Sequence, residues 1–288
     1  MRWRTGRRSE NVEDRRGEGG FPAGPIGIGG GLGLILLALA AAYFGVDPTI
    51  VLDQAGGLAQ GPPSVGAQRQ PSPEDEEMKQ FMSVVLADTE DTWGSIFGES
   101  GYRYATPKLV LYSGAVGSAC GFGQAAMGPF YCPADQRVYI DLGFYDDLRE
   151  RYGAPGDFAQ AYVLAHEVGH HVQNLLGLSE KVQAARERLS EAEANNLSVR
   201  LELQADCLAG LWAHHANRSR QILEKGDVEE ALNAASVIGD DRMQRRARGY
   251  ITPDSFTHGS SAQRMRWFQR GLESGKFSSC DTFAATEL

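Results

Sequence analysis

The distribution of apolar and polar residues divides this chain into an apolar stretch near the N-terminus, a polar connector and a long region with the periodicity of a folded domain. Residues 26–46 carry no charge, and a helix of that length spans about 30 Å, the thickness of bilayer hydrocarbon. Residues 47–77 are rich in glycine, proline and small polar residues, so they bury too little apolar surface to fold alone. The pattern predicts one transmembrane helix, a flexible linker and a domain over residues 78–288.

Within the predicted domain, helical periodicity dominates and a few short runs have the character of strands. An amphipathic helix should begin near Met78, because apolar side chains recur there at helical intervals. Residues 108–112 and 137–142 are rich in β-branched and aromatic residues and are bounded by glycine and proline, which is typical of strands. Further helices are predicted over residues 157–177, 179–215 with a break near 195–196, 227–248 and 260–271. The expected fold class is α+β, mainly helical with a small sheet.

Charge is distributed unevenly along the 288 residues. The formal net charge of -9 disfavours a nucleic-acid partner, because phosphate backbones attract a surplus of basic residues. Arginines nevertheless crowd the N-terminus, at Arg2, Arg4, Arg7, Arg8, Arg15 and Arg16. The positive-inside rule therefore predicts a cytoplasmic basic tail over residues 1–25 and an extracytoplasmic domain held at the cell membrane by a single-pass helix. A cleaved signal peptide is the alternative, because Ala38-Leu39-Ala40 resembles a small-x-small cleavage site.

The cysteines all follow the apolar stretch, so an exported domain would form disulfide bonds. They are Cys120, Cys132, Cys207 and Cys280. Cys120 with Cys132 is the preferred pair, because the two flank a glycine-rich loop between predicted strands, and Cys207 with Cys280 follows by elimination. A thiolate zinc cluster is the alternative, but the spacing lacks the paired C-x2-C signature.

The candidate chemistry centres on a five-residue motif inside the helix predicted from Asp157. Residues 166–170 read His-Glu-Val-Gly-His, the pattern H-E-x-x-H. Residues i and i+4 share one helix face, so His166 and His170 can bind one Zn²⁺ while Glu167 approaches the open coordination position. The alternative, two histidines on a polar surface, fits poorly with their apolar neighbours, because buried imidazoles need partners.

A catalytic zinc site needs a third protein ligand. Glu202 and Asp206 lie at i and i+4 of a later predicted helix, so one carboxylate can bind zinc while the other accepts a hydrogen bond from a ligand histidine. A solvated acidic face is the alternative, although the leucine, alanine and cysteine neighbours make this helix apolar. These residues alone leave open which carboxylate is the ligand.

Several motifs, in the same order along the chain, resemble those of the bacterial neutral zinc metallopeptidases, membrane-anchored proteins of the gluzincin type. They are HEVGHHVQ, RLELQADCLAGLW, DSFTHGSSAQRMRWF and CDTF, within a resemblance that extends from about Met78 to the C-terminus. The resemblance implies a zincin-like metallopeptidase domain. More distant relatives, the integral-membrane CAAX and heat-shock proteases, imply Glu202 as the third zinc ligand and Asp206 as the acceptor behind a histidine.

Those relatives also carry a His-Pro and a downstream arginine near the C-terminus that support the transition state. The similar residues here are His258 and Arg264, with Gly259 in place of the proline. The resemblance therefore implies a catalytic role for His258. A structural histidine at the start of a helix is the alternative.

These features predict a membrane-anchored zinc endopeptidase acting on a peptide or protein substrate. Zinc would lower the pKa of its water to about 7, Glu167 would act as general base, and His258 would help to stabilise the oxyanion. By analogy with zincins, the substrate would pair with the strand predicted at residues 138–142. The alternative is a catalytically silent binding or scaffold protein at the membrane, which has no use for a glutamate beside an open coordination position.

Overall fold

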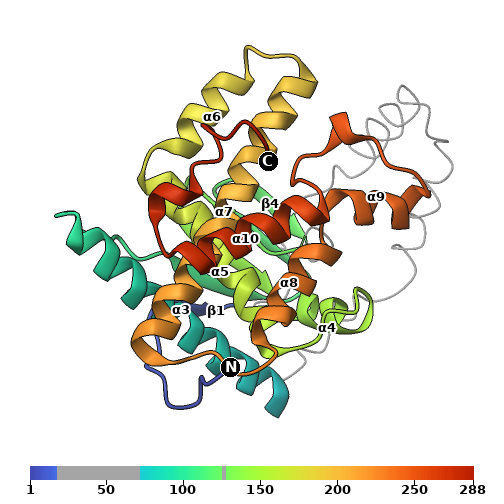
Figure 1. Cartoon of the computed structure of the whole chain (residues 1–288). Coiled ribbons are helices and arrows are strands. Elements are labelled where there is room, and N and C mark those ends of the chain that lie inside the picture. The colour runs from blue at the N-terminus through green and yellow to red at the C-terminus, as the bar shows by residue number, and fades with distance from the viewer. Residues whose placement is uncertain (18–71, 125–127) are drawn as a thin grey trace, which may run out of the picture. The chain divides into compact units, whose positions relative to one another are not determined.

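The computed structural model describes residues 1–17, 72–124 and 128–288, and its mainly helical α+β architecture (Figure 1) confirms the expected fold class. Met1–Arg16 and Pro71–Leu288 form one compact unit. The transmembrane helix predicted at residues 26–46 lies outside the described residues. Among the helices that are described, none has both the length and the apolar composition needed to cross a bilayer.

A four-stranded sheet has the order β1-β2-β6-β5. Its parallel strands are β1 (Val12–Asp14), β2 (Lys108–Tyr112) and β6 (Arg137–Asp141), and β5 (Phe130–Cys132) runs antiparallel to β6. Both predicted strands are confirmed. However, β6 has neighbours on both sides, so residues 138–142 cannot offer a free edge to a substrate as expected. On that side of the sheet the edge strand is β5.

Residues 1–16 of the expected tail over residues 1–25 are part of this folded unit and are not separate from it, whereas residues 18–25 lie outside the described residues. Val12 of β1 lies opposite Leu109 of β2. Three of the six arginines in this segment pair with acidic residues of α3 (Pro73–Glu99): Arg4 with Glu77, Arg7 with Glu90 and Asp91, and Arg16 with Glu76. The sequence pattern did not reveal β1, because a three-residue charged strand has no apolar alternation and its partners lie far along the chain.

This strand pairing also bears on the expected membrane topology. A single crossing between residues 17 and 71 would put β1 and β2 on opposite sides of the bilayer, and their backbone hydrogen bonds could not form. The expected division into a cytoplasmic tail and an extracytoplasmic domain is therefore inconsistent with the sheet.

Asn11 helps to hold the N-terminal segment in place, and its removal should destabilise the protein. Its Nδ2 donates to Glu90 Oε1 at 2.8 Å, and the Ser9 hydroxyl donates to the same oxygen. Glu90 is buried. We expect Asn11→Ala to lower the free energy of unfolding by about 2 kcal/mol, because a buried carboxylate loses a donor. Urea denaturation of the full-length protein measures this, with the exposed Glu10→Ala as control. An unchanged midpoint would exclude the segment from the cooperative unit.

α3 begins at Pro73, earlier than the expected start at Met78, so the last residues of the expected linker are helical. Ser72 is the N-cap: the Asp75 backbone N–H donates to its hydroxyl at 3.1 Å, and the Ser72 N–H donates to Asp75 Oδ2 at 2.8 Å. Proline at the first position suits a helix start. This capping box is the signal that places the boundary.

The other described α-helices are α4 (Gly143–Glu150), α5 (Asp157–Leu175), α6 (Leu178–Arg186), α7 (Glu191–Arg220), α8 (Asp227–Val237), α9 (Asp240–Arg248) and α10 (Ser261–Ser274). The break predicted at residues 195–196 does not occur, because α7 is continuous there. The helix is interrupted earlier, before Glu191, where Ser190 is the N-cap of α7 and forms a capping box with Glu193. The helix predicted over 227–248 is instead two helices separated near Gly239.

The centre of the unit is built from α5, α7 and α10, which lie together in Figure 1. α7 and α10 approach closely because they meet at glycines: a Cβ at Gly271 would lie 1.9 Å from the Cys207 carbonyl oxygen. Both expected disulfides are present. Cys207–Cys280 joins α7 to the 3-10 turn η3 (Phe277–Cys280), and Cys120–Cys132 joins β5 to the hairpin of β3 (Ala115–Ser118) and β4 (Gly121–Gln124).

Candidate metal centre

Two helices bring the three expected zinc ligands together. α5 presents His166 and His170 on one face, and Glu202 faces them from α7. The His166 Nε2 lies 3.2 Å from Glu202 Oε2, and the His170 Nε2 lies 3.4 Å from Glu202 Oε1. One ligand atom from each residue lies within 4.8 Å of the other two. Two imidazole nitrogens and a carboxylate at this spacing form a donor set that suits zinc.

A glycine inside the H-E-x-x-H motif allows the two helices to approach. Gly169 lies between the two histidines, and a Cβ there would be 3.0 Å from the Ala205 carbonyl oxygen on α7. That distance is tighter than ordinary van der Waals contact. Gly169 therefore allows α5 and α7 to pack closely. This packing determines how near Glu202 comes to the imidazoles of His166 and His170.

The second nitrogen of each histidine is held by a polar side chain. His166 Nδ1 lies 2.8 Å from Asp206 Oδ1, and His170 Nδ1 lies 2.9 Å from Gln173 Oε1. An acceptor at Nδ1 keeps the proton there and leaves the Nε2 lone pair for a metal. The contact of Asp206 agrees with its expected role. Gln173 was not anticipated from the sequence, although its position three residues after His170 on the same helix is a detectable signal.

Asp206 is also the centre of a buried charge network. The Arg264 Nε donates to Asp206 Oδ2 at 2.9 Å, the Arg264 Nη2 donates to Oδ1 at 2.9 Å, and the Tyr162 hydroxyl donates to Oδ1 at 2.5 Å. The side chains of Arg264 and Asp206 are 4% and 0% exposed, so neither charge has water to stabilise it. Arg264 thus contacts Asp206, the same carboxylate that holds His166 Nδ1. The sequence did not reveal this contact, because Arg264 lies far from Asp206 along the chain.

The charges of the site shift the pKa values of its members. Burial opposes protonation of His166, but the negative charge of Asp206 and hydrogen bonds to Asp206 and Glu202 raise its pKa to about 10. Burial opposes ionisation of Glu202, but the charge of His170 and hydrogen bonds from both histidines hold its pKa well below the usual range. A metal ion must therefore displace protons from the imidazoles, which makes its affinity depend on pH.

Glu167 lies beside the three ligands and lines a cleft of about 1460 Å³. Burial raises the pKa of this carboxyl group, and the neighbouring His166 and His170 oppose the rise. Within the described residues its side chain has no hydrogen-bond partner, so its oxygens are available to a water or a substrate. A carboxylate with a raised pKa next to a metal site suits a general base.

His258 lies in the wall of the same cleft, on the segment before α10. Its Nδ1 is 3.2 Å from Asp240 Oδ1 and 3.0 Å from the Thr257 hydroxyl. The hydrogen bond with Asp240, followed by the charge of Glu202, raises the pKa of His258. Gly259 has φ of 93°, which proline cannot adopt, so the departure from the His-Pro pattern has a local backbone reason.

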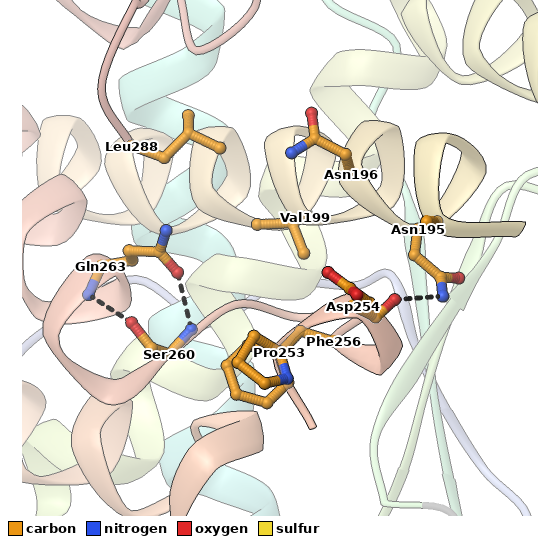
Figure 2. A pocket seen from close by; sticks show the side chains of 10 residues that line it. Asn195, Asn196, Val199, Pro253, Asp254, Phe256, Ser260, Gln263 and Leu288 are labelled. Carbon is orange, nitrogen blue, oxygen red and sulfur yellow. Dashed lines mark hydrogen bonds between the residues drawn. The ribbon is translucent and has the colours of Figure 1, made fainter. Parts of the chain in front are cut away.

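A smaller pocket of about 280 Å³ lies between α7, the 3-10 turn η2 (Pro253–Ser255) and α10. Figure 2 shows its amide, hydroxyl and apolar lining, in which Asn195 donates to the Asp254 carbonyl oxygen at 2.9 Å and Ser260 pairs with Gln263. The residues that line it lack the paired imidazoles of the large cleft. The candidate chemistry therefore lies in the large cleft.

Comparison with known proteins is consistent with this geometry. Residues 1–283 match the sequence profile of a family described as "Putative neutral zinc metallopeptidase". The chain is similar to the uncharacterized protein YpfJ of Escherichia coli K12, with 53% identity covering 98% of this chain and 99% of that protein. It is also similar to the uncharacterized protein Rv2575 of Mycobacterium tuberculosis H37Rv, with 37% identity covering 86% of each. No solved structure matches the chain.

Proposed function

Since the chain belongs to the neutral zinc metallopeptidase family, we propose that it is a zinc-dependent endopeptidase in which Glu167 is the general base. The observation that carries this proposal is the convergence of His166, His170 and Glu202 beside Glu167 in one cleft. Three protein ligands leave a coordination position for water or substrate, which distinguishes a catalytic zinc site from a closed structural one.

The chain's own residues supply the remaining steps of hydrolysis. Zinc, when bound, supplies Lewis acidity toward a water and the scissile carbonyl. Glu167 accepts the proton of the attacking water and returns a proton to the leaving amine. His258, held by Asp240 at Nδ1, would donate from Nε2 to the developing oxyanion. Asp206 and Gln173 keep the imidazoles oriented throughout.

An extended peptide could be held along β5. Phe130 and Tyr131 of this edge strand line the cleft beside the zinc ligands. Main-chain pairing with an edge strand binds a substrate without demanding a particular sequence, which suits an endopeptidase. β5 therefore takes the role that was expected of residues 138–142.

The proposal includes a location outside the cytoplasm and at the cell membrane. Two disulfides favour an oxidising compartment, and the uncharged, apolar residues 26–46 favour attachment to a membrane without a single crossing between residues 17 and 71. Because β1 and β2 share one sheet, residues 1–16 lie on the same side of the membrane as the catalytic domain in this proposal.

Removal of the metal tests the proposed function. We expect the full-length protein to bind one zinc ion per chain and to cleave an unfolded protein. A chelator should reduce cleavage to background, because water then lacks its Lewis acid, and one equivalent of zinc should restore it. Metal analysis and gel electrophoresis measure both effects. Stoichiometric zinc without cleavage of any unfolded protein would favour the silent binding protein, and cleavage by metal-free protein would exclude a zinc mechanism.

A further inference from the structure

Two cations stack on one aromatic ring beside the large cleft, and one of them, Arg151, lines it. Arg151 and Tyr152, just after α4, line the cleft together with Met243 of α9. The guanidinium carbons of Arg246 and Arg151 lie 5.2 Å and 5.7 Å from the centre of the Tyr152 ring. Stacking on one half-buried tyrosine holds Arg151 at the cleft wall and keeps Arg246 next to that wall.

These charges are poorly neutralised by the protein. α9 carries four exposed arginines, Arg242, Arg245, Arg246 and Arg248. No described residue forms a hydrogen bond or an ion pair with any of these four guanidinium groups. Arg151 is 4.0 Å from Asp147, which also lines the cleft, and the Arg151 side chain is 67% exposed, so water screens this pair.

The nearest acidic side chains on α9 are occupied elsewhere. Asp240 accepts hydrogen bonds from the backbone N–H groups of residues 257–259, and Asp241 accepts from Ser261. Their charges therefore stabilise the loop before α10 and do not pair with the arginines. The exposed surface of α9 therefore remains basic on a chain with a net charge of -9.

The other end of the cleft differs in charge. The residues of α6 that line the cleft are Ser179, Glu180 and Gln183, and α6 and α9 are well separated in Figure 1. A peptide lying along the cleft would thus meet the Arg151 guanidinium group, with Asp147 beside it, near α9, and the Glu180 carboxylate near α6. Such a gradient of charge favours one class of substrate at the α9 end.

We propose that the α9 wall, formed by Arg151, Tyr152 and Arg246, is a binding subsite for an acidic side chain of the peptide substrate. This inference rests on the proposed peptidase function and adds the substrate class. Planar guanidinium groups match the geometry of a carboxylate better than ammonium groups do. A membrane of anionic lipids would also attract exposed arginines, but Arg151 and Tyr152 line a concave cleft, which a chain can enter and a flat lipid surface cannot.

Peptide binding tests this subsite independently of catalysis. The parent is the full-length, zinc-loaded Glu167→Gln protein, and the probes are fluorescent peptides that differ only by Glu or Gln at one position in turn. At low salt we expect the best Glu peptide to bind about tenfold more tightly than its Gln twin. Its carboxylate would form ion pairs with Arg151 and Arg246, and two exposed ion pairs together can contribute that factor. The preference should shrink in 0.5 M salt, roughly where the Debye length falls below 5 Å.

Arg151→Gln with Arg246→Gln should abolish most of that preference. The matched control is Arg266→Gln with Arg270→Gln, which removes the same charge from α10, where Arg270 also stacks on an aromatic ring, Trp267. The control should keep the tenfold preference. Equal binding of the twin peptides by the parent, or an unchanged preference in the Arg151 and Arg246 variant, would overturn the subsite.

Two further measurements separate this inference from its alternatives. Cleavage of the Gln peptides by the wild-type chain reports on the proposed peptidase function, so a failure of catalysis is distinct from a failure of the subsite. Sedimentation with phosphatidylserine vesicles reports on lipid binding. If the arginine variant loses vesicle binding but retains the peptide preference, the α9 wall is a membrane contact and the subsite is refuted.

Discussion

Glu167→Gln should abolish peptide hydrolysis while zinc remains bound at full stoichiometry. The amide has nearly the same shape as the carboxylate, but it cannot accept the proton of the attacking water. General-base catalysis contributes about 10²–10⁴-fold, so we expect kcat to fall by that factor. Glu167 is next to the three proposed zinc ligands without being one of them, and its substitution leaves their nitrogens and oxygens in place.

The measurement combines zinc analysis with cleavage of an unfolded protein by wild type and variant. Glu180→Gln is the matched control, because Glu180 also lines the cleft but lies on α6, away from the zinc ligands. It should retain wild-type kcat. Equal turnover by the Glu167→Gln protein would remove this residue from the mechanism, and loss of zinc together with turnover would assign it a structural role.

Asp206→Ala should produce the largest loss of stability and should also weaken zinc binding. The substitution leaves the Arg264 guanidinium buried without its carboxylate partner, and breaking a buried ion pair in this way costs about 3–5 kcal/mol. It also removes the acceptor from His166 Nδ1. Loss of such an acceptor lowers metal affinity by about 10–100-fold.

A double variant separates these two effects. Asp206→Leu with Arg264→Met replaces both buried charges with apolar side chains, so the free energy of unfolding should largely recover. Zinc affinity should stay low, because His166 Nδ1 still lacks its acceptor. Urea denaturation of the metal-free protein and competition with a zinc chelator measure the two quantities. Wild-type zinc affinity in the double variant would show that Asp206 does not orient His166.

The predictions from sequence were most accurate where the signal is local. The i and i+4 spacing of His166 and His170 requires only that residues 157–175 be helical, which their periodicity predicts. Helix boundaries were less accurate. The breaks near residues 190 and 239 depend on caps and on packing against neighbouring helices, and these contribute little to apolar periodicity.

Several contacts could not be predicted because they join residues far apart in the chain. β1 pairs with β2 across residues 17–71, and Arg264 reaches Asp206 only because α7 and α10 meet at Gly210 and Gly271. β5 pairs with β6 along one edge of the sheet, and this pairing depends on the rest of the sheet being formed. No local pattern specifies such contacts, because each depends on how preformed elements pack.

The amino-acid sequence by itself therefore determined the chemical character of the site: two imidazoles and a glutamate on one helix, two carboxylates on another, and four cysteines able to pair. The tertiary structure decided which groups meet. It brought Glu202 to within 3.4 Å of both histidines, engaged Asp206 with Arg264, and included the N-terminal strand in the sheet. Spacing along one helix follows from backbone geometry, whereas distances between elements follow from side-chain packing across the whole folded unit.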